Sequence, residues 1–507
     1  MDKKYVMAVD QGTTGTRVIL FTRDGRPAAS SYEEVDQIYP HPGWVEHDPQ
    51  QYYEGTRRLM QNALQECAAS LDDVAAIGIT CQRETTVLWD RETGQPLWNA
   101  IVWMCRRSAG ICEELKAAGY EQAVREKTGL FIDPYFSGSK IKWILDNVPD
   151  ARRRAEAGTV CMGTVDSWLM WKLSGGRYHV TDFSNASRTM LLNIHSLEWD
   201  SELLDALTIP HNILPQLMPS SGVMAYTDEA ICGTRVPFAG DAGDQHAATF
   251  GQACFEPGMV KNTYGTGLAL MMNIGAEPKL STHGLTTNLG WHVDGQVDYA
   301  LEGVIFTGGA STQWLRDGIK IIHDVAESES LATQVPDTGG VYLVPAFTGL
   351  CAPYWDMYAR GVIVGITRGT SQQHIARAAL EAIAYQTRDI VESMEADSGR
   401  KMTSLRVDGG ATKNNFLMQF QADILDTVIE RPAVTEMAAL GAAYLAGLGV
   451  GFWRDKEELS RNWRLERVFE PRMNQETREQ LYAGWKEAVS RSLGWAKKVA
   501  LAGNPDA

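Results

Sequence analysis

Three short runs of the sequence combine glycine with threonine or aspartate in a way that suits phosphate binding. They are DQGTTGTR (10–17), TYGTG (263–267) and DGG (408–410). Glycine lets backbone N–H groups approach phosphate oxygens, and threonine hydroxyls add further donors. None of the runs is a Walker A motif, because the pattern GxxxxGK[ST] does not occur. Each run alone is consistent with an ordinary turn, but three of them, each at the end of an expected strand, favour a phosphate site.

An adjacent arginine and glutamate, Arg83 and Glu84, offer a second kind of chemistry. They stand in the run QRET (82–85), just after an apolar stretch (74–80) that is typical of a buried strand. Arginine donates hydrogen bonds to hydroxyl oxygens and glutamate accepts them from hydroxyl protons, so the pair matches two neighbouring OH groups. The alternative interpretation is a solvated surface salt bridge.

Short apolar strands are expected to position the glycine-rich runs. Residues 4–10 and 16–22 indicate two strands joined by the first run, and residues 258–262 and 268–273 indicate two strands joined by the second. Asp24-Gly25 is a further hairpin signal. Two hairpins with Thr/Gly tips, half a chain apart, predict a duplicated two-domain architecture. We expect the boundary near residues 255–259.

Helical patterns alternate with these strands. Apolar residues recur near helical spacing over 374–396, with Gly399 following as a stop signal. A second helix is expected from Asn414, and a third over 435–447, where Ala and Gly allow close packing. Mixed strands and helices throughout indicate an α/β or α+β protein.

Composition limits the classes of function. The chain has 507 residues, enough for two or three domains, and a formal net charge of −16, which argues against nucleic acid and anionic membranes as partners. Eight cysteines without a CxxC pair, and no HExxH, give no sign of a zinc site. The start of the sequence shows no apolar signal region, and the most apolar stretch, 437–450, is too short to span a bilayer. These features favour a cytoplasmic protein.

A dozen motifs, in order along the chain, identify a family. Together they resemble the bacterial glycerol kinases, within the wider family of carbohydrate kinases, from about residue 4 to about residue 455. Two stretches, 135–147 and 361–381, also look like general sugar-kinase signatures. The motifs are DQGTTGTR, GITCQRETTVLW, NAIVWMCRR, DPYFSGSKIKWILDN, GTVDSWL, TDFSNASRTMLLNIH, AGDQHAATFGQ, KNTYGTG, GGASTQWLRD, VPAFTGLCAPYWD, RVDGGATKNNFLMQFQ and LGAAYLAGL.

The resemblance implies a fold and a reaction. The fold is the two-domain, actin-like (ribonuclease-H-like) ATPase fold, with a duplicated core and a catalytic cleft between the domains. The N-terminal domain (1–254) would bind glycerol and carry the first phosphate loop, and the C-terminal domain (255–507) would bind the nucleotide. The reaction would be ATP-dependent phosphorylation of glycerol to sn-glycerol 3-phosphate, the first step of glycerol catabolism, with Mg²⁺ as cofactor.

The resemblance also assigns roles to individual residues. Asp244 is the general base, in preference to the nearby Asp241, which we expect to be structural or solvated. Asp10 and Asp244 organise Mg²⁺, Asp10 through water. Trp103 forms an apolar wall behind the glycerol carbons, although plain core packing is the alternative. The hydroxyl-binding residues are Arg83, Glu84, Tyr135, Asp244 and Gln245. The phosphate-binding residues are Thr13, Thr14, Gly15, Arg17 and Thr266. The residues of the nucleoside end are Gly309, Gln313, Gly410, Ala411 and Asn414.

The sequence departs from the family pattern at several points. Ala269 stands where the family usually has an aromatic residue that pairs with Trp103, which predicts a thinner pocket wall and either weaker glycerol binding or access for a larger polyol. His246 stands where Gln is usual. Gly233 and Arg235, in the run CGTR, resemble the loop that binds fructose 1,6-bisphosphate in some bacterial members, so this sugar phosphate is a candidate allosteric ligand. Family resemblance further suggests a homodimer or homotetramer.

Two other functions remain open at this stage. One is a kinase for another polyol or ketose, such as a tetritol or pentulose, on the same scaffold. The other is a nucleotide-binding assembly or regulatory protein, because actin-like folds also build filaments and chaperones. The Arg83–Glu84 pair favours glycerol over both, whereas Ala269 is the feature that favours a larger polyol.

Overall fold

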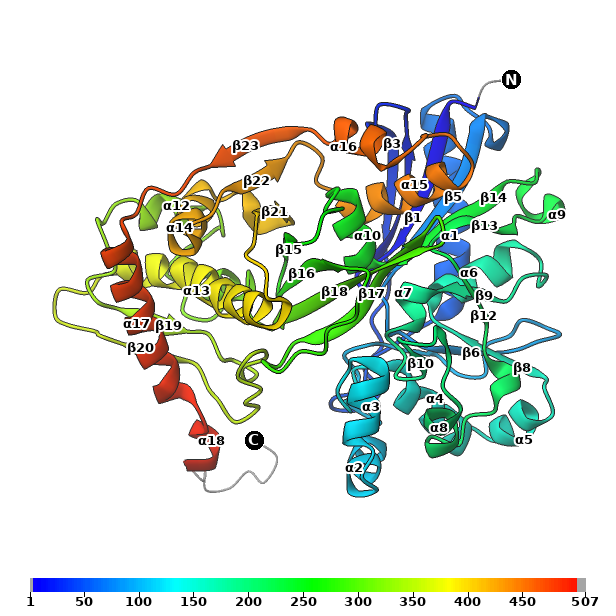
Figure 1. The fold of residues 1–507 in the computed structure, drawn as a ribbon, viewed down its shortest axis with the longest axis horizontal. Helices are drawn as coiled ribbons and strands as arrows, with labels where there is room; N and C mark the ends of the chain where they lie inside the picture. Colours follow the sequence, from blue (N-terminus) through cyan, green and yellow to red (C-terminus); the bar gives the residue numbers. More distant parts are fainter. Residues whose placement is uncertain (1–2, 499–507) are drawn as a thin grey trace.

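The computed structural model describes residues 3–498 and has two lobes, each built around one large β-sheet (Figure 1). The strand order of the first sheet is β13 (Ser221–Tyr226), β14 (Pro237–Gly243), β5 (Val74–Cys81), β1 (Tyr5–Gln11), β2 (Gly15–Phe21) and β3 (Pro27–Glu34). The order of the second sheet is β23 (Leu465–Phe469), β22 (Ile429–Pro432), β21 (Ser404–Asp408), β15 (Met259–Tyr264), β16 (Leu268–Gly275), β18 (Gln296–Ile305) and β17 (Thr286–Val293).

The two sheets repeat the same pattern of strand directions. In the first sheet, β13–β14 is antiparallel, β14–β5 and β5–β1 are parallel, and β1–β2 and β2–β3 are antiparallel. The second sheet follows the same series from β23 to β18 and then adds β17. The predicted duplicated core, with its two hairpins, is therefore confirmed. The central strands β1 and β5 are buried along most of their length, as expected of parallel strands covered on both faces.

Helix α15 (Met437–Gly449) belongs to the second half of the chain but packs on the first sheet, against β1, β5 and β14 (Figure 1). Small residues make this close approach possible, as the Ala/Gly-rich pattern predicted. A Cβ on Gly78 of β5 would lie 2.1 Å from the Ala442 carbonyl oxygen, and a Cβ on Gly441 would lie 1.8 Å from that of Ala247. Ala247 belongs to α10 (Asp244–Gly251), which therefore lies directly against α15.

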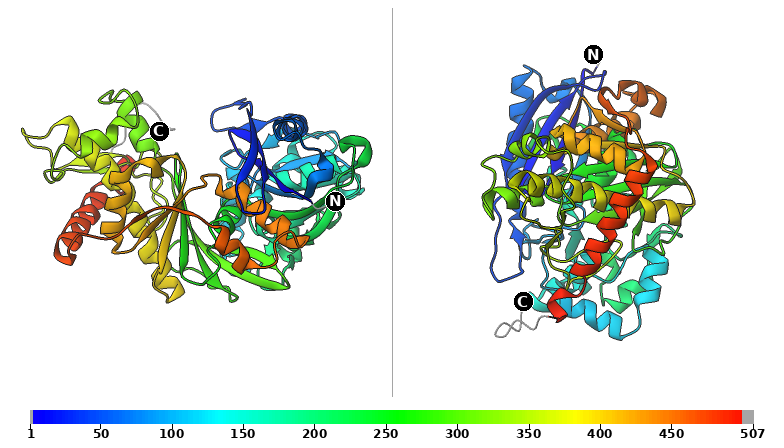
Figure 2. Two further views of the ribbon diagram at one scale, coloured as in Figure 1. Left: turned by 90° about the horizontal axis from the view of Figure 1, so that it is seen from above. Right: turned by 90° about the vertical axis from the view of Figure 1, so that its left-hand side faces the viewer.

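Long helices pack in the second lobe. Helix α13 (Gln372–Ser398) ends at Gly399, whose φ of 68° is left-handed, so the predicted stop signal is confirmed. Asn414 caps α14 (Asn415–Leu425) by accepting a hydrogen bond from Leu417 N. Helix α17 (Gln475–Ser492) lies on the outside of this lobe in both views of Figure 2.

The remaining elements include the segments inserted between β3 and β13, which complete the first lobe. The short strands are β4 (Glu46–His47), β6 (Val87–Asp90), β7 (Ala100–Ile101), β8 (Val160–Gly163), β9 (Val180–Asp182), β10 (Leu192–Asn193), β11 (Glu198–Trp199), β12 (Gln216–Met218), β19 (Tyr342–Val344) and β20 (Val362–Val364). The other helices are α1 (Pro49–Glu66), α2 (Ala109–Ala117), α3 (Glu121–Thr128), α4 (Ser137–Asn147), α5 (Ala151–Glu156), α6 (Val165–Leu173), α7 (Phe183–Ala186), α8 (Ser201–Ala206), α9 (Glu229–Cys232), α11 (Ala310–Asp317), α12 (Glu327–Ala332), α16 (Lys456–Asn462), α18 (Trp495–Lys498) and the 3₁₀ turns η1 (Leu71–Asp73), η2 (His211–Ile213) and η3 (Gly410–Lys413).

Candidate active site

The second and third glycine-rich runs lie next to each other in the second lobe. Gly309 N donates to Gly265 O at 2.9 Å, which places the start of α11 on the β15–β16 turn. Gly409 has a φ of 91°, and a Cβ there would lie 2.5 Å from Tyr264 O, so only glycine fits this contact. The fold thus gathers Thr266, Gly309 and Gly410, which are far apart in the sequence, around one hairpin tip.

The first run forms the turn between β1 and β2. Gly12 N donates to Gly15 O at 3.0 Å, which leaves Thr13 half-buried and Thr14 exposed at the tip. Gly15 is buried under Tyr32, whose ring would clash with a Cβ at that position. Arg17 pairs with Glu436 at 2.9 Å, so its guanidinium already has one carboxylate partner.

Arg83 and Glu84 are not a surface salt bridge. They lie in a buried network with Arg188 and Glu302 in which positive and negative groups alternate, and all four side chains are at most 3% exposed. Arg83 Nη2 lies 2.6 Å from Glu302 Oε1. Arg188 completes the network, with its Nε 2.7 Å from Glu84 Oε1 and its Nη1 2.8 Å from Glu302 Oε2. Because Glu302 lies on β18 and Arg188 follows α7, residues from both lobes hold this pair in place.

Asp244 is the partly exposed carboxylate beside this network. It is the first residue of α10, directly after β14, and its side chain is 33% exposed. Arg83 Nε lies 3.1 Å from Asp244 Oδ1. Gln245 Nε2 donates to Asp244 Oδ2 at 3.3 Å. A carboxylate held at the edge of a buried pocket can accept a proton from a bound hydroxyl group.

Asp10 lies near Asp244, at the end of β1. Burial, followed by the negative charge of Asp244, raises the pKa of Asp10 to about 7, while the Arg17 guanidinium acts in the opposite direction. A carboxylate whose pKa is raised by burial and by a neighbouring carboxylate belongs to an arrangement that a divalent cation would stabilise.

Aromatic side chains connect the buried Arg83–Glu84 network with the first glycine-rich run. The rings of Trp103 and Tyr135 pack edge to face with 5.5 Å between centroids. The Trp103 Nε1 group also donates to Thr13 Oγ1 at 2.8 Å. The Arg188 guanidinium lies 5.6 Å from the centre of the Tyr135 ring. Trp103 therefore contacts both Tyr135 and a threonine of the first glycine-rich run.

Asp241 lies on β14, the strand that precedes Asp244. It is fully buried, accepts hydrogen bonds from Asp182 N and Asn185 Nδ2, and is not solvated. Burial and the nearby carboxylates of Asp166 and Asp182 raise the pKa of Asp241 well above its usual range. This environment fits a structural carboxylic acid.

The remaining predicted residues lie in two places, on the elements that begin at the gathered runs of the second lobe and at the edge of the first lobe. Gln313 and Gly410 are exposed, Ala411 is half-buried, and the Asn414 side chain is used as the α14 cap. Gly233 and Arg235 follow α9 at the far edge of the first lobe, away from β1 and α10, and the Arg235 guanidinium lies over the Tyr226 ring at 4.0 Å (Figure 1).

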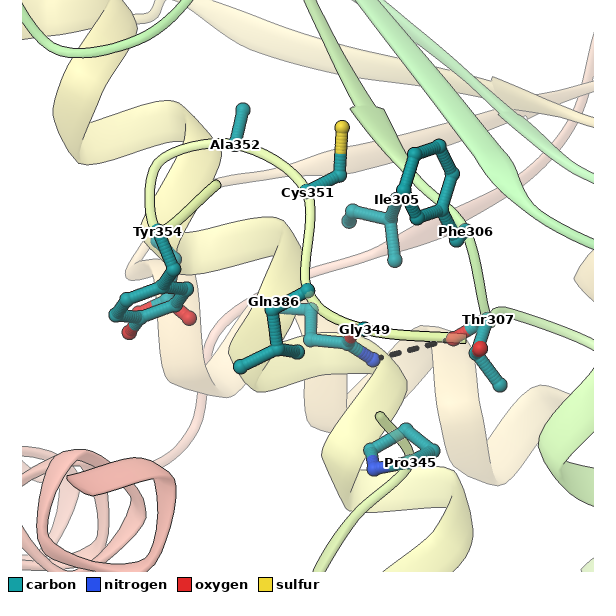
Figure 3. Close-up of a pocket in the computed structure, with 11 residues that line it drawn as sticks. Ile305, Phe306, Thr307, Pro345, Gly349, Cys351, Ala352, Tyr354 and Gln386 are labelled. Carbon is teal, nitrogen blue, oxygen red and sulfur yellow. Dashed lines mark hydrogen bonds between the residues drawn. The ribbon is translucent and has the colours of Figure 1, made fainter. Parts of the chain in front are cut away.

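A small cavity lies in the second lobe beside the segment that leads to Gly308 and Gly309. Its volume is about 10 Å³, room for about one water molecule, and Gln386 Nε2 donates to Thr307 O at its rim (Figure 3). Within residues 3–498, no group of three or more His, Cys, Asp or Glu side chains could hold a metal ion, and no helix is long and apolar enough to cross a membrane. The eight cysteines are free.

Sequence reasoning missed three charged residues of the site: Arg188, Glu302 and Lys261. Arg188 and Lys261 lie within motifs that carry the family resemblance, but the resemblance assigned no role to either residue. Glu302 had a recognisable signal, because it is a single acid within the otherwise apolar strand stretch YALEGVI. A lone charge in a buried strand indicates a partnered or functional group.

Comparison with known proteins agrees with this geometry. The FGGY family of carbohydrate kinases matches the chain through its N-terminal domain over residues 5–251 and its C-terminal domain over residues 260–450. The chain belongs to this family.

Individual relatives narrow the class. The chain is 62% identical over 495 residues to glycerol kinase 2 of Thermotoga maritima, covering 98% of this chain and 100% of that one. It is 59% identical to the glycerol kinase of Symbiobacterium thermophilum over 98% of this chain and 100% of that one. Plasmodium falciparum glycerol kinase with ADP has a TM-score of 0.92 at 36% identity, covering 97% and 99% of the two chains. The predicted resemblance to bacterial glycerol kinases and the predicted fold class are thereby confirmed.

Proposed function

We propose that this protein phosphorylates glycerol with ATP, giving sn-glycerol 3-phosphate and ADP. The observation that carries the proposal is the buried network that presents Arg83 and Glu84 beside the partly exposed carboxylate of Asp244. A neutral triol needs paired donors and acceptors rather than one dominant charge, and this pair supplies both. Tyr135 and Gln245 add a hydroxyl group and an amide.

Asp244 is the general base of the reaction. It accepts the proton of a terminal hydroxyl group while that oxygen forms a bond to the γ-phosphorus, and the bond from the γ-phosphorus to the β–γ bridging oxygen breaks to release ADP. The Arg83 guanidinium, 3.1 Å from Asp244 Oδ1, orients the carboxylate. A glycerol hydroxyl is a weak acid, so the proton moves as the transition state forms.

The nucleotide would lie along the three glycine-rich runs. Thr13, Thr14, Gly15, Arg17 and Thr266 would contact its phosphates. Gly309, Gln313, Gly410, Ala411 and Asn414 would hold the nucleoside end. The gathering of the second and third runs with Gly309 supports this division, because it brings members of both groups, Thr266, Gly309 and Gly410, to one place.

Asp10 and Asp244 would hold Mg²⁺ with waters completing the coordination. The residues fit the ion, since Mg²⁺ takes few protein carboxylates, and burial and the charge of Asp244 otherwise raise the pKa of Asp10. When bound, the ion neutralises charge on the transferred phosphoryl group.

The assembly and the regulation of the enzyme belong to the same proposal. We expect a homodimer or homotetramer, with two domains that meet near residues 255–259. Fructose 1,6-bisphosphate remains a candidate ligand of Gly233 and Arg235, both exposed at one edge of the first lobe.

The decisive experiment measures ADP release with glycerol, erythritol, xylulose, ribulose and gluconate as acceptors, alongside a sample without acceptor. We expect strong dependence on glycerol, and ³¹P NMR of the product should show a phosphomonoester on a terminal carbon. ADP release that does not depend on any acceptor would refute the proposal and favour a nucleotide-binding assembly protein instead.

Ala269 is expected to tune the choice of polyol. It is half-buried on β16, opposite Thr263 and Val304. Replacing it with phenylalanine adds apolar contact worth about 1–3 kcal/mol, so KM for glycerol should fall by about 10-fold and erythritol should become a poorer substrate. Steady-state kinetics with both polyols test this. An Ala269→Phe enzyme with the parent's KM and the parent's preference would show that position 269 does not face the substrate.

A further inference from the structure

Lys261 is a buried lysine on β15 with all three of its hydrogen-bond donors in use. Its side-chain ammonium lies 2.5 Å from Gln245 Oε1, 3.0 Å from Thr263 Oγ1 and 3.3 Å from Ala269 O. The residue is 0% exposed. Lysine is almost never fully buried without a specific arrangement of partners, so this one has a defined task.

The three partners come from both lobes. Thr263 and Ala269 face each other across the β15–β16 hairpin, and Gln245 lies on α10 of the first lobe. Lys261 therefore reaches from the second sheet to a residue of the acceptor pocket. Burial lowers the pKa of Lys261, but the carboxylates of Asp408, Asp244 and Glu302 act in the opposite direction and favour the charged form.

The contact with Gln245 fixes which way its amide points. An ammonium group only donates, so it pairs with the oxygen of the amide and not with the nitrogen. With Oε1 held by Lys261, the Nε2 group must face the other way, and it lies 3.3 Å from Asp244 Oδ2. A free glutamine could rotate by half a turn and present its oxygen to the carboxylate, which would be repulsive.

We propose that Lys261 is a positioning residue that locks the Gln245 amide so that its N–H groups face Asp244 and the acceptor hydroxyls. The inference rests on the proposed function, because Gln245 and Asp244 are taken there as acceptor-binding and proton-accepting groups. The proposal adds Lys261, a residue of the second lobe, to the acceptor site. It also explains why a charged side chain is buried in the second sheet.

A double-mutant cycle tests the proposal. Full-length Lys261→Met, Gln245→Ala and the double variant are purified, checked for folding by thermal unfolding, and assayed for kcat and for KM of glycerol and ATP. Because a hydrogen bond to a charged group is involved, each single change should lower kcat/KM for glycerol by about 10–100-fold. If Lys261 acts through Gln245, the double variant should be no more than about 3-fold worse than the more impaired single variant.

Two further variants sharpen the result. Lys261→Gln keeps an N–H donor for Gln245 Oε1 and should recover part of the lost kcat/KM, and it replaces Lys261→Met in the cycle if that variant does not fold. Lys172→Met removes a half-buried lysine of the first lobe, which lies over the rings of Tyr53 and Trp168, and should leave all constants within about 2-fold.

The outcomes separate the two proposals. Multiplicative losses in the double variant, or a Lys261→Met enzyme with the parent's kinetics beside an impaired Gln245→Ala enzyme, would overturn the role of Lys261 alone. If the single variants Gln245→Ala and Asp244→Asn both kept the parent's kcat and KM, the proposed function would be overturned, and this inference with it.

Discussion

An Asp244→Asn enzyme should turn over glycerol about 10²–10⁴-fold more slowly than the parent, with KM for glycerol changed by only a few-fold. The range is that of a positioned general base, and asparagine keeps the shape of the side chain but cannot accept the proton. The amide can still occupy the place beside Arg83 Nε and Gln245, so the pocket should retain its form. ADP release under saturating glycerol and ATP measures the loss, and glycerol binding to the variant is followed separately by calorimetry.

Asp241→Asn is the matched control, three residues earlier on the same segment. Burial, followed by the carboxylates of Asp166 and Asp182, raises the pKa of Asp241 well above its usual range, which favours the neutral form. An asparagine resembles that neutral acid, and kcat should stay within about 3-fold. A large loss in Asp241→Asn with full activity in Asp244→Asn would exchange the two roles and refute our choice of base.

The sequence carried much of the architecture because the signals were local. Alternating apolar strands and Thr/Gly turns predicted the hairpins β1–β2 and β15–β16, and Gly399 predicted the end of α13. The repeated strand order of the two sheets confirms the duplication that those hairpins suggested. Likewise, the Ala/Gly pattern of 435–447 predicted close packing. The structure confirms it, because a Cβ at Gly78 or at Gly441 would clash with the neighbouring backbone.

What the sequence could not supply was pairing across long distances. Glu302 is 219 residues from Arg83, and Gln245 contacts Lys261 from a different lobe. Local patterns carry no information about such contacts, whereas burial decides their energy. The packing of α15 on the first sheet could not be predicted for the same reason. The sequence predicted the helix itself but not the sheet against which it packs. The assignments of site residues beyond the local motifs remain predictions that the variants above will test.

Glu302→Gln should have the largest effect on stability of any single change in the site. Glu302 is fully buried and is shared by Arg83 and Arg188, at 2.6 and 2.8 Å. Removing its charge leaves two buried guanidinium groups with only Glu84 and the partly exposed Asp244 as carboxylate neighbours. Breaking a buried ionic pair in this way costs about 3–5 kcal/mol of the free energy of unfolding. KM for glycerol should also rise, because Arg83 loses the partner that orients it.

The pH dependence of this loss has a definite sign. Burial alone would raise the pKa of Glu302, but Arg188 and Arg83 hold it well below its ordinary value near 4.5. A folded-state pKa below the unfolded one means that the carboxylate stabilises the fold fully at neutral pH and progressively less as pH falls below the unfolded value. The stability gap between parent and Glu302→Gln should therefore be nearly constant from pH 7 to about pH 5 and narrow as pH falls below about 4.5.

Glu46→Gln provides the comparison that isolates the active-site role. Glu46 is also buried and lies 2.6 Å from the Arg107 guanidinium, away from the acceptor residues. The Glu46→Gln enzyme should lose stability in a similar way, yet keep the parent's KM for glycerol. Urea unfolding at several pH values and steady-state kinetics of both variants make the test. Equal KM changes in the two variants would mean that Glu302 acts only on stability, whereas a KM change confined to Glu302→Gln would show that the second sheet orients Arg83 for the substrate.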